Sequence, residues 1–350
     1  MKSIRIIVLL ALTLFGNWIV AQETDANIFG HPFSDGLFRY SLFGQSLLAD
    51  IHPNFVRLDV ASVTNHQEWD WGQTGKAMRW NTFGVMGINV PLWSGETEGK
   101  NAFLCVSLPL SSAIWLDLGE PVTAPVVNTD YRIALPVFTY VRKLNRNFFR
   151  NYSISLAPYK HESTHLGDEI TLQRVENKLP LLRVNVSEHY SELVFSINEA
   201  DREDSYWHTF RVGLMVLWNA RRGWYFIDAT DGDASLAKPR FSPWEAYLQY
   251  QFQSPVRHCF QWVVSAEIRN RALYGYPEFT WSSDGVHYEM QDESRIFTYN
   301  LFCGLRFCGN RKGMFSRMSV GMRLYHGNNP YGQFRNHKDF NHLGVCIIFE

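Results

Sequence analysis

Residues 248–253 read Leu-Gln-Tyr-Gln-Phe-Gln, with an apolar side chain at every even position and a polar one at every odd position. The same alternation runs through 258–270, 314–326 and the final stretch 341–350. Because successive residues of a β-strand point to opposite faces, each of these segments has one apolar and one polar face. This period of two, rather than helical spacing, dominates the chain from about residue 54 and predicts an all-β protein.

About twelve such segments follow one another, and no repeat, low-complexity tract or linker interrupts the series. They lie near 54–63, 76–93, 101–118, 129–142, 150–165, 181–197, 206–219, 241–253, 258–270, 296–308, 314–326 and 341–350. Bacterial outer-membrane barrels have an even number of antiparallel strands. We therefore predict one transmembrane, antiparallel up-and-down β-barrel over residues 54–350.

A soluble sandwich would show the same alternation, but two observations favour the membrane barrel. The connections are short at one end, as in 254–257 and 309–313, and mostly longer at the other, as in 220–240 and 271–295, which is the habit of outer-membrane barrels. The polar faces also carry many arginines, which would be costly in a dry core and are expected to line a hydrated or ion-paired lumen. They are Arg57, Arg79, Arg132, Arg142, Arg183, Arg211, Arg269, Arg306, Arg317 and Arg323, alongside Asp59 and Glu267.

The N-terminal residues predict export. Lys2 and Arg5 precede an apolar run over 6–15, and Ala21 is a small residue suited to cleavage, which together describe a secretory signal peptide over residues 1–21. Residues 22–53 would then form a leader, a periplasmic cap or a plug inside the barrel mouth. We expect the protein in the bacterial outer membrane, with membrane lipid, lipopolysaccharide and the barrel-assembly machinery as its partners.

The composition argues against several other functions. The chain has 33 Lys and Arg against 34 Asp and Glu, a net charge of −1, so no basic face accumulates for a nucleic acid.

Three histidines spread over two predicted strands are weak evidence for a metal, and the aspartates of one predicted loop do not have EF-hand spacing. These residues are His161, His165 and His189, and Asp228, Asp231 and Asp233. We predict neither a metal nor a cofactor.

Three stretches carry a resemblance. They are Ser46-Leu47-Leu48-Ala49-Asp50 before the first strand, His161-Glu162-Ser163-Thr164-His165-Leu166-Gly167-Asp168-Glu169 at the end of the fifth, and Asn329-Pro330-Tyr331-Gly332-Gln333-Phe334 before the last. They resemble an uncharacterised family of bacterial outer-membrane β-barrel proteins, which is known as a domain of unknown function. The resemblance implies a barrel in the outer membrane and no agreed activity.

His161 and Ser163 suggest one chemistry. Two residues apart on a strand, they share a face, so the imidazole can accept the serine proton. The pair is similar to that of outer-membrane phospholipase A and lipid A 3-O-deacylase, which implies His161 as general base and Ser163 as nucleophile in an outer-leaflet lipid hydrolase. Such a base needs a third group to orient it, and the spacing leaves three candidates. They are Asp168, Glu169 and Glu176.

Alternation carried on without interruption from Ser153 and Ser155 puts His161 and Ser163 on the lumen side instead, although a bulge at Pro158 would reverse this. On the lumen side the pair would join His165 and polar residues of the sixth strand in a patch that binds a small, unidentified ligand, lines a restricted passage or fills the lumen. Those residues are Arg183, Asn185, Ser187 and His189. We rank this binding or passage role first and the hydrolase second. The direction of Ser163 separates them, since a membrane-facing side chain favours the hydrolase.

Overall fold

The structure is a computed structural model of the 350-residue chain. It describes residues 27–28, 31–32, 36–37, 46–53, 55–64, 79–96, 101–118, 126–144, 148–167, 181–199, 205–227, 234–237, 243–272, 277–282, 285–290, 295–308, 317–331 and 340–349. The predicted signal peptide, residues 1–21, lies outside them. Within these residues there is no helix long and apolar enough to cross a membrane.

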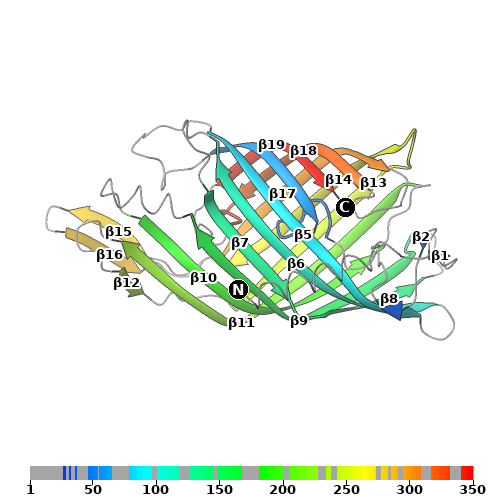
Figure 1. The fold of residues 1–350 in the computed structure, drawn as a ribbon, viewed down its shortest axis with the longest axis horizontal. Helices are drawn as coiled ribbons and strands as arrows, with labels where there is room; N and C mark the ends of the chain where they lie inside the picture. Colours follow the sequence, from blue (N-terminus) through cyan, green and yellow to red (C-terminus); the bar gives the residue numbers. More distant parts are fainter. Residues whose placement is uncertain are drawn as a thin grey trace, which may run out of the picture.

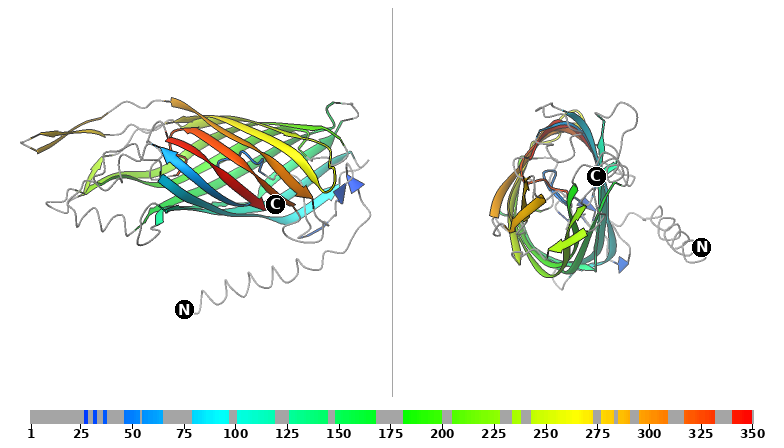
Figure 2. Two further views of the ribbon diagram at one scale, coloured as in Figure 1. Left: turned by 90° about the horizontal axis from the view of Figure 1, so that it is seen from above. Right: turned by 90° about the vertical axis from the view of Figure 1, so that its left-hand side faces the viewer.

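Twelve antiparallel strands form one closed barrel, as the alternation predicts (Figures 1 and 2). Around the ring they are β4 (Val56–Thr64), β5 (Arg79–Glu96), β6 (Ala102–Asp117), β7 (Val126–Ala134) continued by β8 (Val137–Lys143), β9 (Asn151–Leu166), β10 (Leu181–Ile197), β11 (Trp207–Ile227), β13 (Trp244–Gln253), β14 (Phe260–Ala272), β17 (Arg295–Cys308), β18 (Arg317–Gly327) and β19 (Phe340–Phe349). Pairing between β19 and β4 closes the ring and leaves no exposed strand edge between the first and last strands.

The remaining strands are short. They are β1 (Asn27–Ile28), β2 (His31–Pro32), β3 (Gly36–Leu37), β12 (Ala234–Ala237), β15 (Pro277–Ser282) and β16 (Gly285–Met290). β15 and β16 form a hairpin within the predicted loop 271–295 and extend beyond the barrel, as does β12 (Figure 1). The end with these long connections is assigned to the cell exterior, since the opposite end has short turns such as 254–259.

The barrel wall has an apolar outside and a polar inside. On β4, Leu58 is 43% exposed while its neighbours Arg57 and Asp59 are buried on the lumen side. On β13, Leu248 is 49% exposed and Gln249 is fully buried. A surface of this kind is stable only in contact with lipid, and closed strands satisfy their backbone groups within a bilayer. The protein is therefore an outer-membrane barrel.

Residues 46–53 and Phe55 lie inside the lumen and form a plug. Leu48 donates its backbone N–H to Gln251 Oε1 at 3.0 Å, and Ala49 donates its own to Ser265 Oγ at 3.1 Å. Leu48 and Phe55 are buried in a cluster with lumen-facing residues of three strands, which are Val263, Phe302, Cys346 and Ile348. Of the three roles considered for residues 22–53, a position inside the barrel therefore fits residues 46–53.

A second segment enters the lumen from the connection between β18 and β19. Residues 328–331 are buried, and Tyr331 stacks on Phe83 with ring centroids 5.2 Å apart. Arg271 donates to the backbone carbonyl of Asn329 at 3.2 Å. Burial raises the pKa of the Tyr331 hydroxyl above its ordinary value. This segment and the plug therefore both lie inside the lumen.

Two neighbouring strands change face half-way along their length. On the β10 side, Pro158 and Tyr159 of β9 stand opposite the single residue Ser191. Such a β-bulge adds one residue to a strand and reverses its alternation. The adjacent strand changes at the same level, because the lumen-facing positions are even in β7 and odd in β8. β11 carries another bulge nearby, at Trp218.

These changes of face determine whether an arginine that was predicted to face the lumen does so. Six predicted lumen arginines lie on the polar face, as expected: Arg57, Arg211, Arg269, Arg306 and Arg323 are buried, and Arg132 is 10% exposed. Arg142 was expected beside them, which is wrong: it is exposed on the outer face, since it follows the change of face between β7 and β8. Arg317 is half-buried, and the side chains of Arg79 and Arg183 lie outside the described residues. Arg271, taken for a loop residue, is buried in the lumen.

Candidate functional site

The upper half of β9 presents His161, Ser163 and His165 to the outside of the barrel. The residues between them, Glu162 and Thr164, are buried on the lumen side. The cross-strand partners agree with this assignment. Ser163 pairs with Tyr131, which is 54% exposed, and His161 pairs with Ile133, which is 48% exposed. The expected lumen position of His161, Ser163 and His165 is therefore wrong, and the bulge at Pro158 is the physical reason.

Two residues of the predicted patch on the sixth strand, Ser187 and His189, likewise do not face the lumen. Ser187 and His189 of β10 are the register partners of Ser163 and His161, so they share the outer face. The side chains of Arg183 and Asn185 lie outside the described residues. A ligand-binding role for these residues stays a prediction, and it would have to act from the membrane side.

His161 is held by its neighbours in one orientation. Its Nδ1 lies 3.1 Å from the backbone carbonyl oxygen of Glu188, and its ring centroid is 4.8 Å from that of His189. In the tautomer that carries its proton on Nδ1, the ring donates this hydrogen bond and leaves Nε2 as the basic atom. The three carboxylates considered as orienting groups lie outside the described residues: Asp168, Glu169 and Glu176. The group that orients His161 in the structure is the backbone carbonyl of Glu188. Because every residue has a backbone carbonyl, the amino-acid sequence does not indicate this role.

Aromatic rings surround the histidines on the outer face. His189 lies 5.3 Å from Tyr159 and 5.7 Å from Trp218, measured between ring centroids, and Tyr159 lies 5.6 Å from Trp218. Below them toward the membrane centre, the outer face is apolar, with Leu156 and Leu193 nearly half exposed. His161 and Ser163 therefore lie near the boundary between the apolar band and the polar external rim, where aromatic residues commonly gather.

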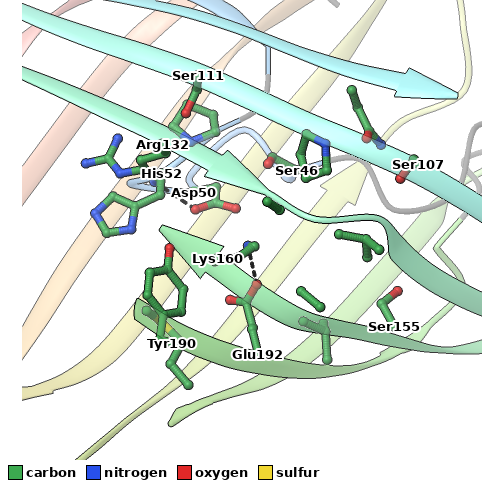
Figure 3. A pocket seen from close by; sticks show the side chains of 18 of the residues that line it. Ser46, Asp50, His52, Ser107, Ser111, Arg132, Ser155, Lys160, Tyr190 and Glu192 are labelled. Carbon is green, nitrogen blue, oxygen red and sulfur yellow. Dashed lines mark hydrogen bonds and ion pairs between the residues drawn. The ribbon is translucent and has the colours of Figure 1, made fainter. Parts of the chain in front are cut away.

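The lumen offers a different kind of space. A cavity of about 110 Å³ lies between the plug and the wall formed by β5 to β11, β13 and β14, and it is large enough for several water molecules. Figure 3 shows Asp50 of the plug facing the ion pair between Lys160 and Glu192 across this space. Tyr247 donates a hydrogen bond to the same Glu192 carboxylate at 2.9 Å.

Most charges that line this cavity are matched by a neighbour. Arg132 Nη2 lies 3.2 Å from carboxylate oxygens of both Asp130 and Glu162. Arg211 and Arg269 are paired in the same way, with Glu199 and Glu267 respectively, each at 3.0 Å. Buried charges are tolerated when they are paired in this manner. The arginine-rich lumen is thus balanced by carboxylates, several of which sequence parity did not assign to it.

No metal site is found within the part of the chain that the structure describes, since no three His, Cys, Asp or Glu side chains gather there. The predicted loop residues Asp228, Asp231 and Asp233 lie outside that part. His161 and His189 are adjacent, but His165, the third histidine considered as a metal ligand, does not form a cluster with them.

No family model and no curated protein matches this chain, so its resemblance to an uncharacterised barrel family stays a prediction. Solved structures similar to it include outer membrane phospholipase A from Escherichia coli, at 12% identity and a TM-score of 0.41 over 96% of this chain and 97% of that one. LpxR from Salmonella typhimurium is similar at 9% identity, with a TM-score of 0.31 over 84% and 99% of the chains. A mutant of the monoaromatic hydrocarbon channel TodX also shows 9% identity and a TM-score of 0.31, over 88% and 93%. Both a phospholipase and a channel are among these structures.

Proposed function

We propose that this protein hydrolyses an acyl ester of outer-leaflet lipid, with Ser163 as the nucleophile and His161 as the general base. The observation that carries the proposal is the change of face at Pro158, which turns both side chains toward the membrane. A lipid ester can approach a residue on the outer wall of a barrel, whereas a lumen filled by a plug would keep it away.

The depth of the pair suits an ester bond. β9 runs from Asn151 at the short-turn end to Leu166 at the external end, so Ser163 lies three residues from the external end of its strand. Acyl chains would then lie along the apolar outer face below it, beside Leu156 and Leu193. The polar head of the same lipid would lie toward the external rim.

The chemistry follows from the orientation of His161. With Nδ1–H donated to the Glu188 carbonyl, Nε2 accepts the proton of Ser163 as Oγ attacks the ester carbonyl carbon. Collapse of the tetrahedral intermediate breaks the bond to the alcohol oxygen, which leaves with the proton from Nε2. Water then attacks the acyl-serine, His161 again takes the proton, and the fatty acid is released as Ser163 Oγ regains its hydrogen.

The direct test uses the full chain reconstituted in vesicles of phospholipid with lipopolysaccharide. We expect fatty acid release by the wild type and a loss of at least a hundredfold in both Ser163→Ala and His161→Ala, because each removes a reacting group. The matched control is Ser112→Ala, which removes a half-buried serine from the outer face of β6 and is expected to retain wild-type activity.

Acyl patterns of both lipid classes, measured by mass spectrometry, give the readout. Release from one class only would define the substrate. If the wild-type protein leaves phospholipid and lipid A equally intact, the hydrolase proposal is wrong.

A further inference from the structure

We propose that Ser191 is a positioning residue, whose side chain holds the bulges that turn His161 and Ser163 toward the membrane. This inference rests on the proposed function for its catalytic consequence, but its structural consequence can be measured independently. Ser191 lies on β10, between the two strands that carry bulges, and its hydroxyl is hydrogen-bonded to Pro158 and Trp218 rather than to either proposed catalytic residue.

The hydroxyl of Ser191 joins the two bulges. It donates to the backbone carbonyl oxygen of Pro158 at 2.7 Å, and it accepts from Trp218 Nε1 at 3.1 Å. Pro158 belongs to the bulge of β9, and Trp218 is the bulged residue of β11. One side chain therefore ties together irregular points on three consecutive strands.

The two hydrogen bonds of the Ser191 hydroxyl, which form a bridge between the bulges, lie at the lipid-facing surface, where their loss would be costly. Pro158 and Tyr159 face only Ser191 across the ladder, so regular strand pairing is interrupted there. Trp218 is 53% exposed on the outer face, where lipid rather than water surrounds it. A backbone carbonyl or an indole N–H that lacks a hydrogen-bond partner is costly in lipid. The Ser191 hydroxyl is a partner for both, because it donates to the Pro158 carbonyl and accepts from the Trp218 indole.

Losing the bridge would favour a β9 without the bulge. A strand that drops one bulged residue regains continuous alternation, and every residue beyond that point changes face. His161, Ser163 and His165 would then turn from the membrane toward the lumen. The rings of Trp218 and His189, 5.7 Å apart, connect the same bridge to His161.

The experiment compares Ser191→Val with Ser191→Thr in the full chain reconstituted in lipid. These side chains have nearly the same shape, but only threonine keeps the hydroxyl. Covalent labelling of Ser163 by a fluorophosphonate reports an activated serine, and a nitroxide attached at His165→Cys, in a background without the native cysteines, reports the face of the strand. We expect Ser191→Val to slow labelling at least tenfold and to immobilise the nitroxide, while Ser191→Thr keeps the wild-type values of both. Ser112→Val serves as the control and should change neither.

The outcomes separate the two proposals. Wild-type labelling and wild-type nitroxide mobility in an assembled Ser191→Val protein would overturn the role of Ser191. Absence of labelling in the wild type would refute the proposed hydrolase, while the nitroxide would still test Ser191. If Ser191→Val does not assemble, Trp218→Phe keeps an aromatic ring but removes the indole N–H donor and one ring, and it is expected to slow labelling about threefold. Labelling at the wild-type rate would then overturn the inference.

Discussion

At the scale of single residues, the lumen contains buried charged side chains that are stabilised by pairing with one another. Asp59 lies 3.2 Å from Arg57 Nε and 2.7 Å from Arg323 Nη1, and Arg323 also donates to Asn300. Removal of one member leaves another buried charge short of its partner. We expect Arg323→Gln to lower the free energy of unfolding by about 3–5 kcal/mol, as is usual for breaking a buried ion pair.

Arg142 provides the matched control for that measurement. It was predicted to lie in the same lumen, but it is exposed on the outer face of β8. Arg142→Gln is therefore expected to change the free energy of unfolding by no more than about 0.5 kcal/mol. Denaturant titrations of both variants in the same lipid vesicles give the comparison. Equal effects would show that the two arginines share one environment, contrary to this structure.

At the scale of elements, the plug is a folded part of the barrel. Leu48 is fully buried against Phe55 and Phe302, and its backbone is hydrogen-bonded to the wall. We expect Leu48→Ala to cost about 2–5 kcal/mol, the usual range for a buried leucine. Leu118, 45% exposed beyond the end of β6, is the control, and its change to alanine should cost under about 1 kcal/mol. If Leu48→Ala leaves the free energy of unfolding unchanged, Leu48 is not packed inside the barrel, and the position of the plug is wrong.

The sequence predicts each strand more reliably than its faces. Alternation locates the twelve strands and correctly assigns the faces of β4, β13, β14 and β19, where no residue breaks the pairing. It fails beyond Pro136 and Pro158, because one extra residue in a strand reverses every later side chain. Pro158 was visible as a place for a bulge. In the structure Pro158 accepts a hydrogen bond from Ser191, which in turn accepts one from Trp218, and periodicity within one strand contains no information about such contacts from other strands.

At the scale of the whole molecule, two segments of the chain occupy the lumen of the barrel. They are the plug, residues 46–53 with Phe55, and residues 328–331, and Ile51 of the plug and Tyr331 belong to one buried cluster. We therefore expect the intact protein to be silent in planar lipid bilayers. A steady open conductance of the wild type would contradict this and would revive the passage function expected from the polar lumen.

The central claim is that β9 reverses its faces at Pro158 and so turns Ser163 toward lipid. A scan of single cysteines along residues 152–165, each carrying a nitroxide in a background without the native cysteines, tests it directly through accessibility to oxygen dissolved in the bilayer. High accessibility is predicted at the even positions 154 and 156 and then at the odd positions 161 and 163. High accessibility that continues at even positions up to 164 would contradict the reversal, and with it the membrane-facing site.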